Sequence, residues 1–101
     1  MNVSITARKF KAHETLKQFV KDEVSMLNKY NDDILSADVK LSFQNPTNSI
    51  KTADITVTIP GQILNATNQS EDFKKSVTAS VEKLIKQLKT IKSKRTTARV
   101  K

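Results

Sequence analysis

The stretch KLIKQLKTIKSKR (residues 83–95) places a lysine at every third position and ends in a dense basic cluster. Lysine and arginine side chains can neutralise the phosphates of a nucleic acid and release its counterions. The same residues also occur on the solvated face of ordinary amphipathic helices, and cations suit a helix C-terminus. For any single lysine, a solvated surface position is the simpler interpretation.

The charge balance of the chain favours a polyanionic partner for the whole cluster. The formal net charge is +8, and residues 83–101 hold eight Lys and Arg but no Asp or Glu. Residues 1–82 are neutral, with ten basic and ten acidic side chains. A solubilising surface normally mixes both signs, whereas a segregated field of one sign attracts the opposite charge.

Nucleic acid is the polyanion that fits the last helix best. On a helical wheel with Lys75 at zero, Lys83, Lys86 and Lys89 fall near 80°, 20° and 320°, while the apolar residues fall between about 160° and 240°. A membrane-surface helix needs its apolar face free, but here the fold needs that face as core. The chain has one Tyr and four Phe, mostly at core-like positions, so an exposed pair for base stacking is not indicated. We expect recognition of the backbone and shape of folded RNA.

The sequence does not indicate an enzyme. His13, the sole histidine, precedes a helix among polar residues, and Asp32 and Asp33 are typical of a turn. Without cysteine the chain has no thiol nucleophile or thiolate metal site, and one glycine leaves no phosphate-binding loop. We therefore predict no catalytic residues, no metal and no cofactor.

The lengths and periodicities indicate a single α+β domain. The 101 residues suffice for about one core. Residues 2–8, 37–44, 53–60 and 62–68 have the pattern of strands, and residues 14–30 have helical spacing. A second helix follows Ser70, its expected cap, and extends to about Ser93. The order β-α-β-β-β-α predicts a four-stranded sheet with both helices packed on one face and a polar face in water, as in double-stranded-RNA-binding domains. No apolar run approaches the roughly 20 residues of a membrane span, and no signal peptide is evident, so we expect a cytoplasmic protein.

Two segments point to a known family. NVSITARKFKAHETLKQFVKDEVSMLNKY (residues 2–30) resembles the opening of the bacterial ribosome hibernation promoting factor and ribosome-associated inhibitor family, also called the sigma-54 modulation protein family. In that family a short strand ends in Ile-Thr-Gly-Arg, and a helix closes in a Leu-x-Lys-Tyr type sequence. IPGQILNATNQSEDFKKSVTASVEKLIKQLKTIKSK (residues 59–94) is similar to its second half, with the Gly turn, the Glu-Asp-aromatic helix entry and the Lys-Leu-x-x-Gln-Leu core.

The resemblance implies a protein that binds the small ribosomal subunit near the decoding centre, occupies the mRNA and tRNA channel and keeps idle ribosomes inactive in stressed or stationary-phase cells. Its partners would be rRNA and the ribosomal proteins that line the mRNA channel, and the free protein would be a monomer. The expected rRNA-binding residues are Arg8, Lys29, Lys75, Lys83, Lys86, Lys89, Lys92, Lys94 and Arg95. Two alternatives remain open: a general structured-RNA-binding or ribosomal accessory protein, and a protein-interaction module that uses the Thr-rich sheet face.

The chain departs from the family pattern in three places. Ala7 stands where the family usually has Gly, and KTIKSKR (residues 89–95) lacks the His or aromatic residue often found there. The chain also ends after one domain, so we expect the short hibernation form rather than a relative with a second, ribosome-dimerising domain. Residues 1–95 would form the ribosome-binding domain, and residues 96–101 a basic tail that we expect to be disordered.

Overall fold

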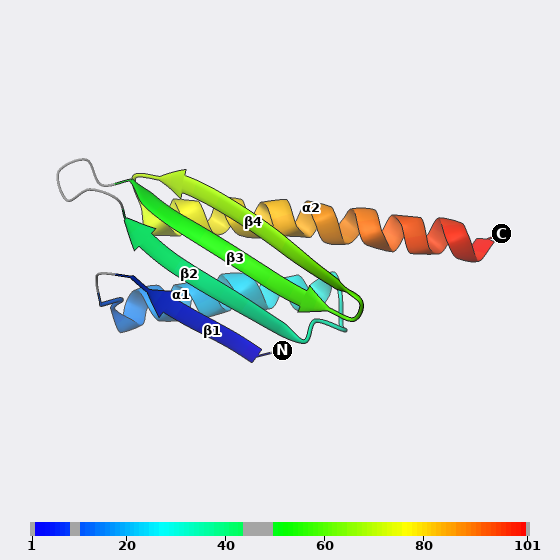
Figure 1. Cartoon of the computed structure of the whole chain (residues 1–101), viewed down its shortest axis with the longest axis horizontal. Coiled ribbons are helices and arrows are strands. Elements are labelled where there is room, and N and C mark those ends of the chain that lie inside the picture. The colour runs from blue at the N-terminus through cyan, green and yellow to red at the C-terminus, as the bar shows by residue number, and fades with distance from the viewer. Residues whose placement is uncertain (1, 9–10, 44–49, 101) are drawn as a thin grey trace.

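The computed structural model describes residues 2–8, 11–43 and 50–100, with side chains described as far as Ile91 (Figure 1). The elements are β1 (Asn2–Ala7), α1 (Glu14–Ser25), the 3₁₀ helix η1 (Met26–Lys29), β2 (Ser36–Phe43), β3 (Lys51–Ile59), β4 (Gln62–Ser70) and α2 (Phe73–Val100). This order confirms the predicted β-α-β-β-β-α fold class.

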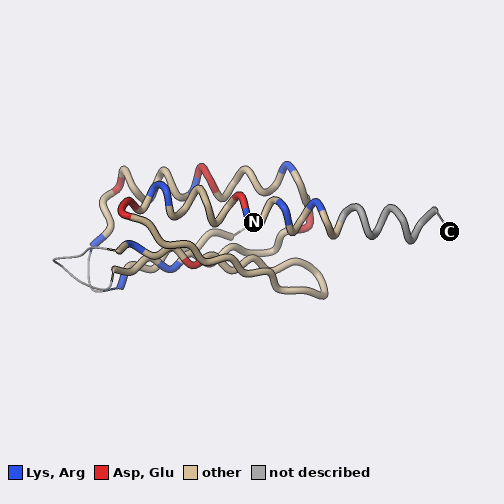
Figure 2. The backbone as a smooth tube through the Cα atoms, turned by 90° about the horizontal axis from the view of Figure 1, so that it is seen from above, with Lys and Arg blue, Asp and Glu red and all other residues tan. Residues whose placement is uncertain are grey.

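The four strands form one sheet in the order β1-β2-β3-β4. Strand β1 is parallel to β2 because the chain returns through the α1 crossover, and the other two pairs are antiparallel. Pro60 and Gly61 form the turn between β3 and β4, where Gly61 adopts a φ of 80°. Both helices cover the same face of the sheet, and the other face is open (Figures 1 and 2).

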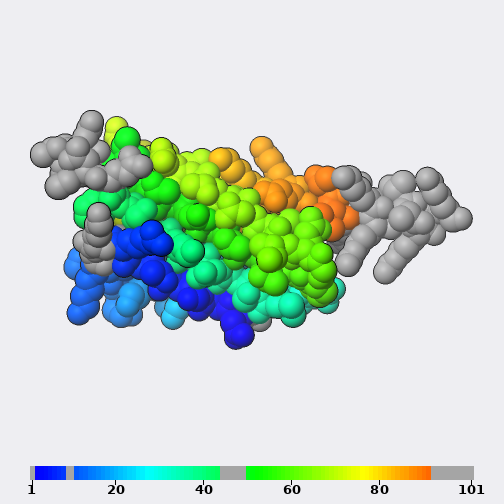
Figure 3. Space-filling view, viewed as in Figure 1, coloured from blue at the N-terminus to red at the C-terminus, as the bar shows by residue number. Residues whose placement is uncertain are grey.

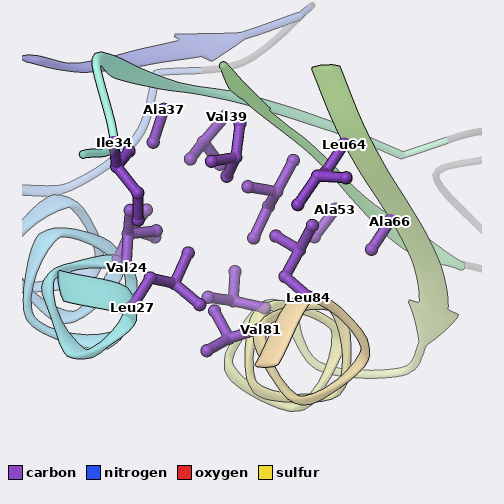
Figure 4. Close-up of a cluster of buried hydrophobic side chains, with 14 of the residues drawn as sticks. Val24, Leu27, Ile34, Ala37, Val39, Ala53, Leu64, Ala66, Val81 and Leu84 are labelled. Atoms are coloured by element: carbon purple, nitrogen blue, oxygen red, sulfur yellow. The ribbon is translucent and has the colours of Figure 1, made fainter. Parts of the chain in front are cut away.

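The core follows from the alternation along the strands and the helical spacing of the apolar residues. Every second residue of β2 and β3 points toward the helices, and the apolar stripes of α1 and α2 close over them (Figure 4). The fully buried side chains include Val20, Val24, Leu27, Val39, Leu41, Ile55, Val57, Val77 and Leu84. Strand β1 is less covered, with Val3 and Ile5 half-buried.

Two buried serines fasten the start of α2 to β3. The Ser76 hydroxyl donates to the carbonyl oxygen of Lys51 at 2.7 Å, and the Ser80 hydroxyl donates to that of Ala53 at 3.1 Å. Both side chains are inaccessible to solvent. Because a serine is small, the helix can approach the sheet closely while these hydroxyls stay hydrogen-bonded.

The helix cap differs from the one expected from the sequence. Ser70 is still part of β4, where it pairs with Lys51, so α2 begins only at Phe73. The capping group is the Asp72 carboxylate, whose Oδ1 accepts a hydrogen bond from the N–H of Lys74 at 3.0 Å. The Ser70 hydroxyl instead accepts from the N–H of Asp72 and contacts the Ser76 hydroxyl. The prediction that Ser70 caps the helix was therefore wrong by two residues.

Helix α2 is longer than expected. Its backbone continues to Val100, seven residues past Ser93, because residues 94–100 contain no Gly or Pro that would stop it. Its last turns project beyond the sheet, which accounts for the elongated dimensions of 55 × 22 × 19 Å (Figure 1). The disorder expected for residues 96–101 in solution stays a prediction. In the described part of the chain, no helix is both long and apolar enough to cross a membrane.

Candidate nucleic-acid interface

Helix α2 turns its central lysines outward. Lys83, Lys86 and Lys89 are exposed, while Leu84 and Leu88 between them are buried against the sheet. The lysine spacing of three residues is shorter than the helical repeat of 3.6, so each lysine falls about 60° behind the last. The basic stripe therefore winds from the β4 side of α2 toward the α1 side. Basic positions are visible along the helix layer in Figure 2.

Lys83 lies at the β4 end of this winding stripe. Its Nζ donates a hydrogen bond to the carbonyl oxygen of Thr67 on β4 at 3.0 Å. One turn further along α2, the Gln87 side-chain amide donates to the carbonyl oxygen of Asn65 at 3.1 Å. The Lys83 ammonium is thus held against the sheet edge and still exposed to solvent.

Lys86 lies at the rim of a shallow groove between β4 and α2. The groove is also lined by Gln62, Leu64, Gln87, Thr90 and Ile91. Lys86 is exposed, and no hydrogen bond or ion pair to its ammonium is present among the described residues. Its charge is therefore available to a partner at this surface.

Lys89 lies on the opposite side of the stripe. Its Nζ is 5.5 Å from the centroid of the Tyr30 ring, an arrangement typical of a cation–π contact. Tyr30 follows η1 directly, and the last residue of η1 is the exposed Lys29. This contact brings Lys29 to the same end of the molecule as the α2 lysines, although 60 residues separate it from Lys89 in the sequence.

Two of the predicted residues lie away from this group. Arg8 follows β1, at the opposite edge of the sheet from β4, and its N–H donates to the carbonyl oxygen of Leu41 at 2.9 Å. Lys75 is in the first turn of α2, roughly 21 Å along the axis from Lys89 at ~1.5 Å per residue. Both side chains are exposed. Any contact of Arg8 with RNA would require a different part of the RNA surface from the α2 stripe.

Lys92, Lys94 and Arg95 belong to the stretch of α2 that continues past Ile91. The part of α2 before this stretch lies beside β4 in the space-filling view (Figure 3). The side chains of Lys92, Lys94 and Arg95 lie outside the described residues, so their predicted contacts stay predictions. The backbone places all three on the same rod as Lys83, Lys86 and Lys89.

Gln87 and Lys74 were not among the predicted site residues. The signal for Gln87 was its position near 120° on the same wheel, between the lysine stripe and the apolar face, where a side chain can reach the sheet edge. Lys74 is exposed beside Lys75, and its Nζ lies 5.5 Å from the centroid of the Phe19 ring on α1.

The lysines of the stripe keep their charge uncompensated within the described ranges. The ion pair found there joins Lys17 to Glu14 on α1, at 3.9 Å, and none involves Lys83, Lys86 or Lys89. Glu82 is the one acidic residue of α2. A stripe of exposed ammonium groups on a rigid helix can bind a row of phosphates.

Comparison with solved structures shows the same fold. A structure described as a ribosomal subunit interface protein from Coxiella burnetii has a TM-score of 0.83 and 22% sequence identity, covering 92% of this chain and 99% of that chain. The N-terminal domain of Thermus thermophilus Protein Y has a TM-score of 0.81 and 24% identity, covering 90% of this chain and 99% of that chain.

Sequence comparison identifies the family. A search of curated protein sequences finds no match. The family profile described as Sigma 54 modulation protein / S30EA ribosomal protein matches residues 3–96, which include all the elements except the first residue of β1 and the last four of α2. The chain therefore belongs to the Sigma 54 modulation protein / S30EA ribosomal protein family.

Proposed function

We propose that this protein binds the small ribosomal subunit through rRNA at the mRNA and tRNA channel near the decoding centre, and so keeps idle ribosomes inactive in the cytoplasm. The observation that carries the proposal is the stripe of exposed, uncompensated lysines on α2, in a chain whose family consists of non-enzymatic, ribosome-associated factors. The description of the Coxiella protein as a ribosomal subunit interface protein supports the same partner.

The mechanism requires no chemistry beyond charge and shape. The buried apolar side of α2 and the Ser76 and Ser80 hydrogen bonds fix the helix on the sheet, so the lysines are presented on a rigid rod. A rigid basic rod loses little conformational freedom on binding and releases counterions from the phosphates it contacts. Occupation of a channel that mRNA and tRNA must enter would then block translation sterically.

The test is co-sedimentation with small subunits on sucrose gradients, together with inhibition of translation in vitro. The variant Lys83→Glu/Lys86→Glu/Lys89→Glu should lose both activities while retaining its circular dichroism spectrum. A matched control, Lys11→Glu/Lys21→Glu/Lys40→Glu, changes the net charge equally at exposed positions away from α2 and should keep most of the binding. Normal ribosome binding by the α2 variant would refute the proposed surface.

Salt dependence gives an independent test. With about five phosphate contacts and a slope of ~0.7–0.9 per contact, a fourfold increase in salt should weaken binding roughly a hundredfold or more.

A general structured-RNA-binding protein is the second candidate, because backbone contacts by lysine carry no sequence information. Competition separates the two. Unrelated duplex RNA in molar excess should leave ribosome binding largely intact if the ribosome is the specific target, and should abolish it if the protein binds any folded RNA.

A further inference from the structure

The two edges of the sheet differ in whether side chains of the helices hydrogen-bond to their outward main-chain groups. At the β4 edge, the side chains of Lys83 and Gln87 donate hydrogen bonds to the carbonyl oxygens of Thr67 and Asn65. These two carbonyls are two residues apart, so both point away from β3, on the outer side of β4. Helix α2 therefore occupies acceptor groups that an additional strand would need.

The β1 edge has no such cover within the described residues. Asn2 and Arg8 donate their N–H groups to Leu35 and Leu41, so the even-numbered residues of β1 face β2. In a parallel ladder the alternate residues, Val3, Ile5 and Ala7, then point their N–H and C=O groups outward. No described residue makes a hydrogen bond to these outward groups. Such a row is a template for strand pairing.

The sequence of β1 is complementary to itself in the antiparallel direction. Asn2–Ala7 contains no charged residue and alternates polar and apolar side chains. Pairing centred on Ile5 places Val3 of one copy opposite Ala7 of the other, and all three outward residues exchange both main-chain hydrogen bonds. The pairing also covers Val3 and Ile5, which are only half-buried in the single chain.

Electrostatic repulsion is weakest at this edge. The net charge of +8 lies on α2, which packs over β3 and β4 rather than β1 (Figure 1). At a strand spacing of ~4.8 Å, two copies joined through β1 would hold their α2 helices roughly 30 Å apart. This separation exceeds three Debye lengths at physiological salt, where the length is ~8 Å.

We propose that the β1 edge binds a second copy of this chain, by antiparallel β1–β1 pairing that joins two four-stranded sheets into one. The free energy gained from the few hydrogen bonds of this short strand is largely offset by the translational and rotational entropy that two molecules lose on association. We therefore expect a dissociation constant on the order of 100 µM. The monomer expected from the sequence is then the form at low concentration. Because α2 takes no part, the dimer is independent of the proposed ribosome binding.

Sedimentation equilibrium from about 10 µM to 1 mM should show concentration-dependent dimerisation at physiological salt, where the charges of the two α2 helices are screened from each other. The variant Ser4→Lys/Thr6→Lys places like charges opposite each other twice in the proposed register and should weaken association at least tenfold. The matched control Gln62→Lys/Gln69→Lys adds the same charge on exposed positions of β4 and should have little effect. A wild-type chain that stays monomeric at 1 mM, or equal weakening by both variants, overturns the proposal.

Spin labels provide a positional test, because the chain has no cysteine of its own. Labels on Ser4→Cys should lie within roughly 20 Å of each other in the dimer, since position 4 is one residue from the centre of the pairing. Labels on Gln69→Cys should be separated by roughly seven strand spacings across the joined sheet and by about 20 Å along the strands, about 39 Å in all. A short distance at position 69 and a long one at position 4 would show pairing through β4 and refute the proposal.

Discussion

Lys83, Lys86 and Lys89 carry the same charge, but their surroundings divide their roles. Lys83 hydrogen-bonds to the edge of β4 and Lys89 lies over the Tyr30 ring, whereas Lys86 extends from the groove rim. The first two combine a structural contact with a charge that RNA can use. Lys86 has no such contact among the described residues. Its replacement should therefore change RNA binding without changing the stability of the fold.

Single neutralisations should separate these roles. Lys86→Gln should lower the slope of log affinity against log salt by about one unit and leave stability unchanged, because the side chain only meets phosphate. Lys83→Gln should also lower the free energy of unfolding, by up to about 1 kcal/mol, through loss of the hydrogen bond to Thr67. Filter binding at several salt concentrations and urea denaturation measure the two quantities. Equal stability losses in both variants would contradict this division.

At the scale of elements, α2 is fixed on the sheet both by apolar packing and by hydrogen bonds. Its apolar side packs on β3 and β4, and the Ser76 and Ser80 hydroxyls donate hydrogen bonds to two carbonyl oxygens of β3. At such buried positions, loss of the hydrogen bond or a larger side chain is expected to lower the free energy of unfolding.

Ser80 allows a graded test of this anchoring. Ser80→Ala should cost about 1 kcal/mol of unfolding free energy, because it removes the hydrogen bond from the buried hydroxyl to the carbonyl oxygen of Ala53. Ser80→Val should cost more, about 1–3 kcal/mol, since the added methyl groups overpack the helix–sheet contact. Ser25→Ala, at an exposed position at the end of α1, is the control and should change stability by less than about 0.5 kcal/mol. Chemical denaturation measures the unfolding free energy of the three variants. An unchanged unfolding free energy in Ser80→Val would show that the helix–sheet contact has room for a larger side chain.

At the scale of the whole molecule, the buried apolar residues and the basic residues of α2 are concentrated in different parts of the helix. Among the residues of α2 whose side chains the structure describes, the last buried one is Leu88 and Ile91 is partly buried, while the basic residues of the sequence continue to residue 101. Folding and polyanion binding can therefore be separated by shortening the chain.

Removal of residues 92–101 should leave the unfolding free energy within about 0.5 kcal/mol of the full chain, because the shortened chain keeps every described core residue in place. The loss of Lys92, Lys94 and Arg95 should reduce the salt slope of ribosome binding by up to about three units. Denaturation and salt-dependent binding of the shortened chain measure both effects. An unchanged salt slope would exclude these three side chains as phosphate contacts.

Local periodicity was enough to predict the elements, their order and the face that each buries. Alternation in β2 and β3 and the apolar stripe of α2 encode these properties within a few residues of the chain. The outward direction of Lys83, Lys86 and Lys89 was predictable for the same reason, since a helical wheel needs no knowledge of the rest of the fold.

The partners of each group were decided only by the tertiary structure. Periodicity does not say that β1 lies at a free edge, that Lys29 joins the α2 lysines through Tyr30, or that Arg8 lies across the sheet from them. The cap also moved from Ser70 to Asp72, because the pairing of β4 with β3 continued to Ser70. The sequence by itself determined which side of each element is apolar or charged, since that property is local. Only the packing of distant segments decided which charged groups meet and which sheet edge is covered, because those contacts depend on long-range geometry.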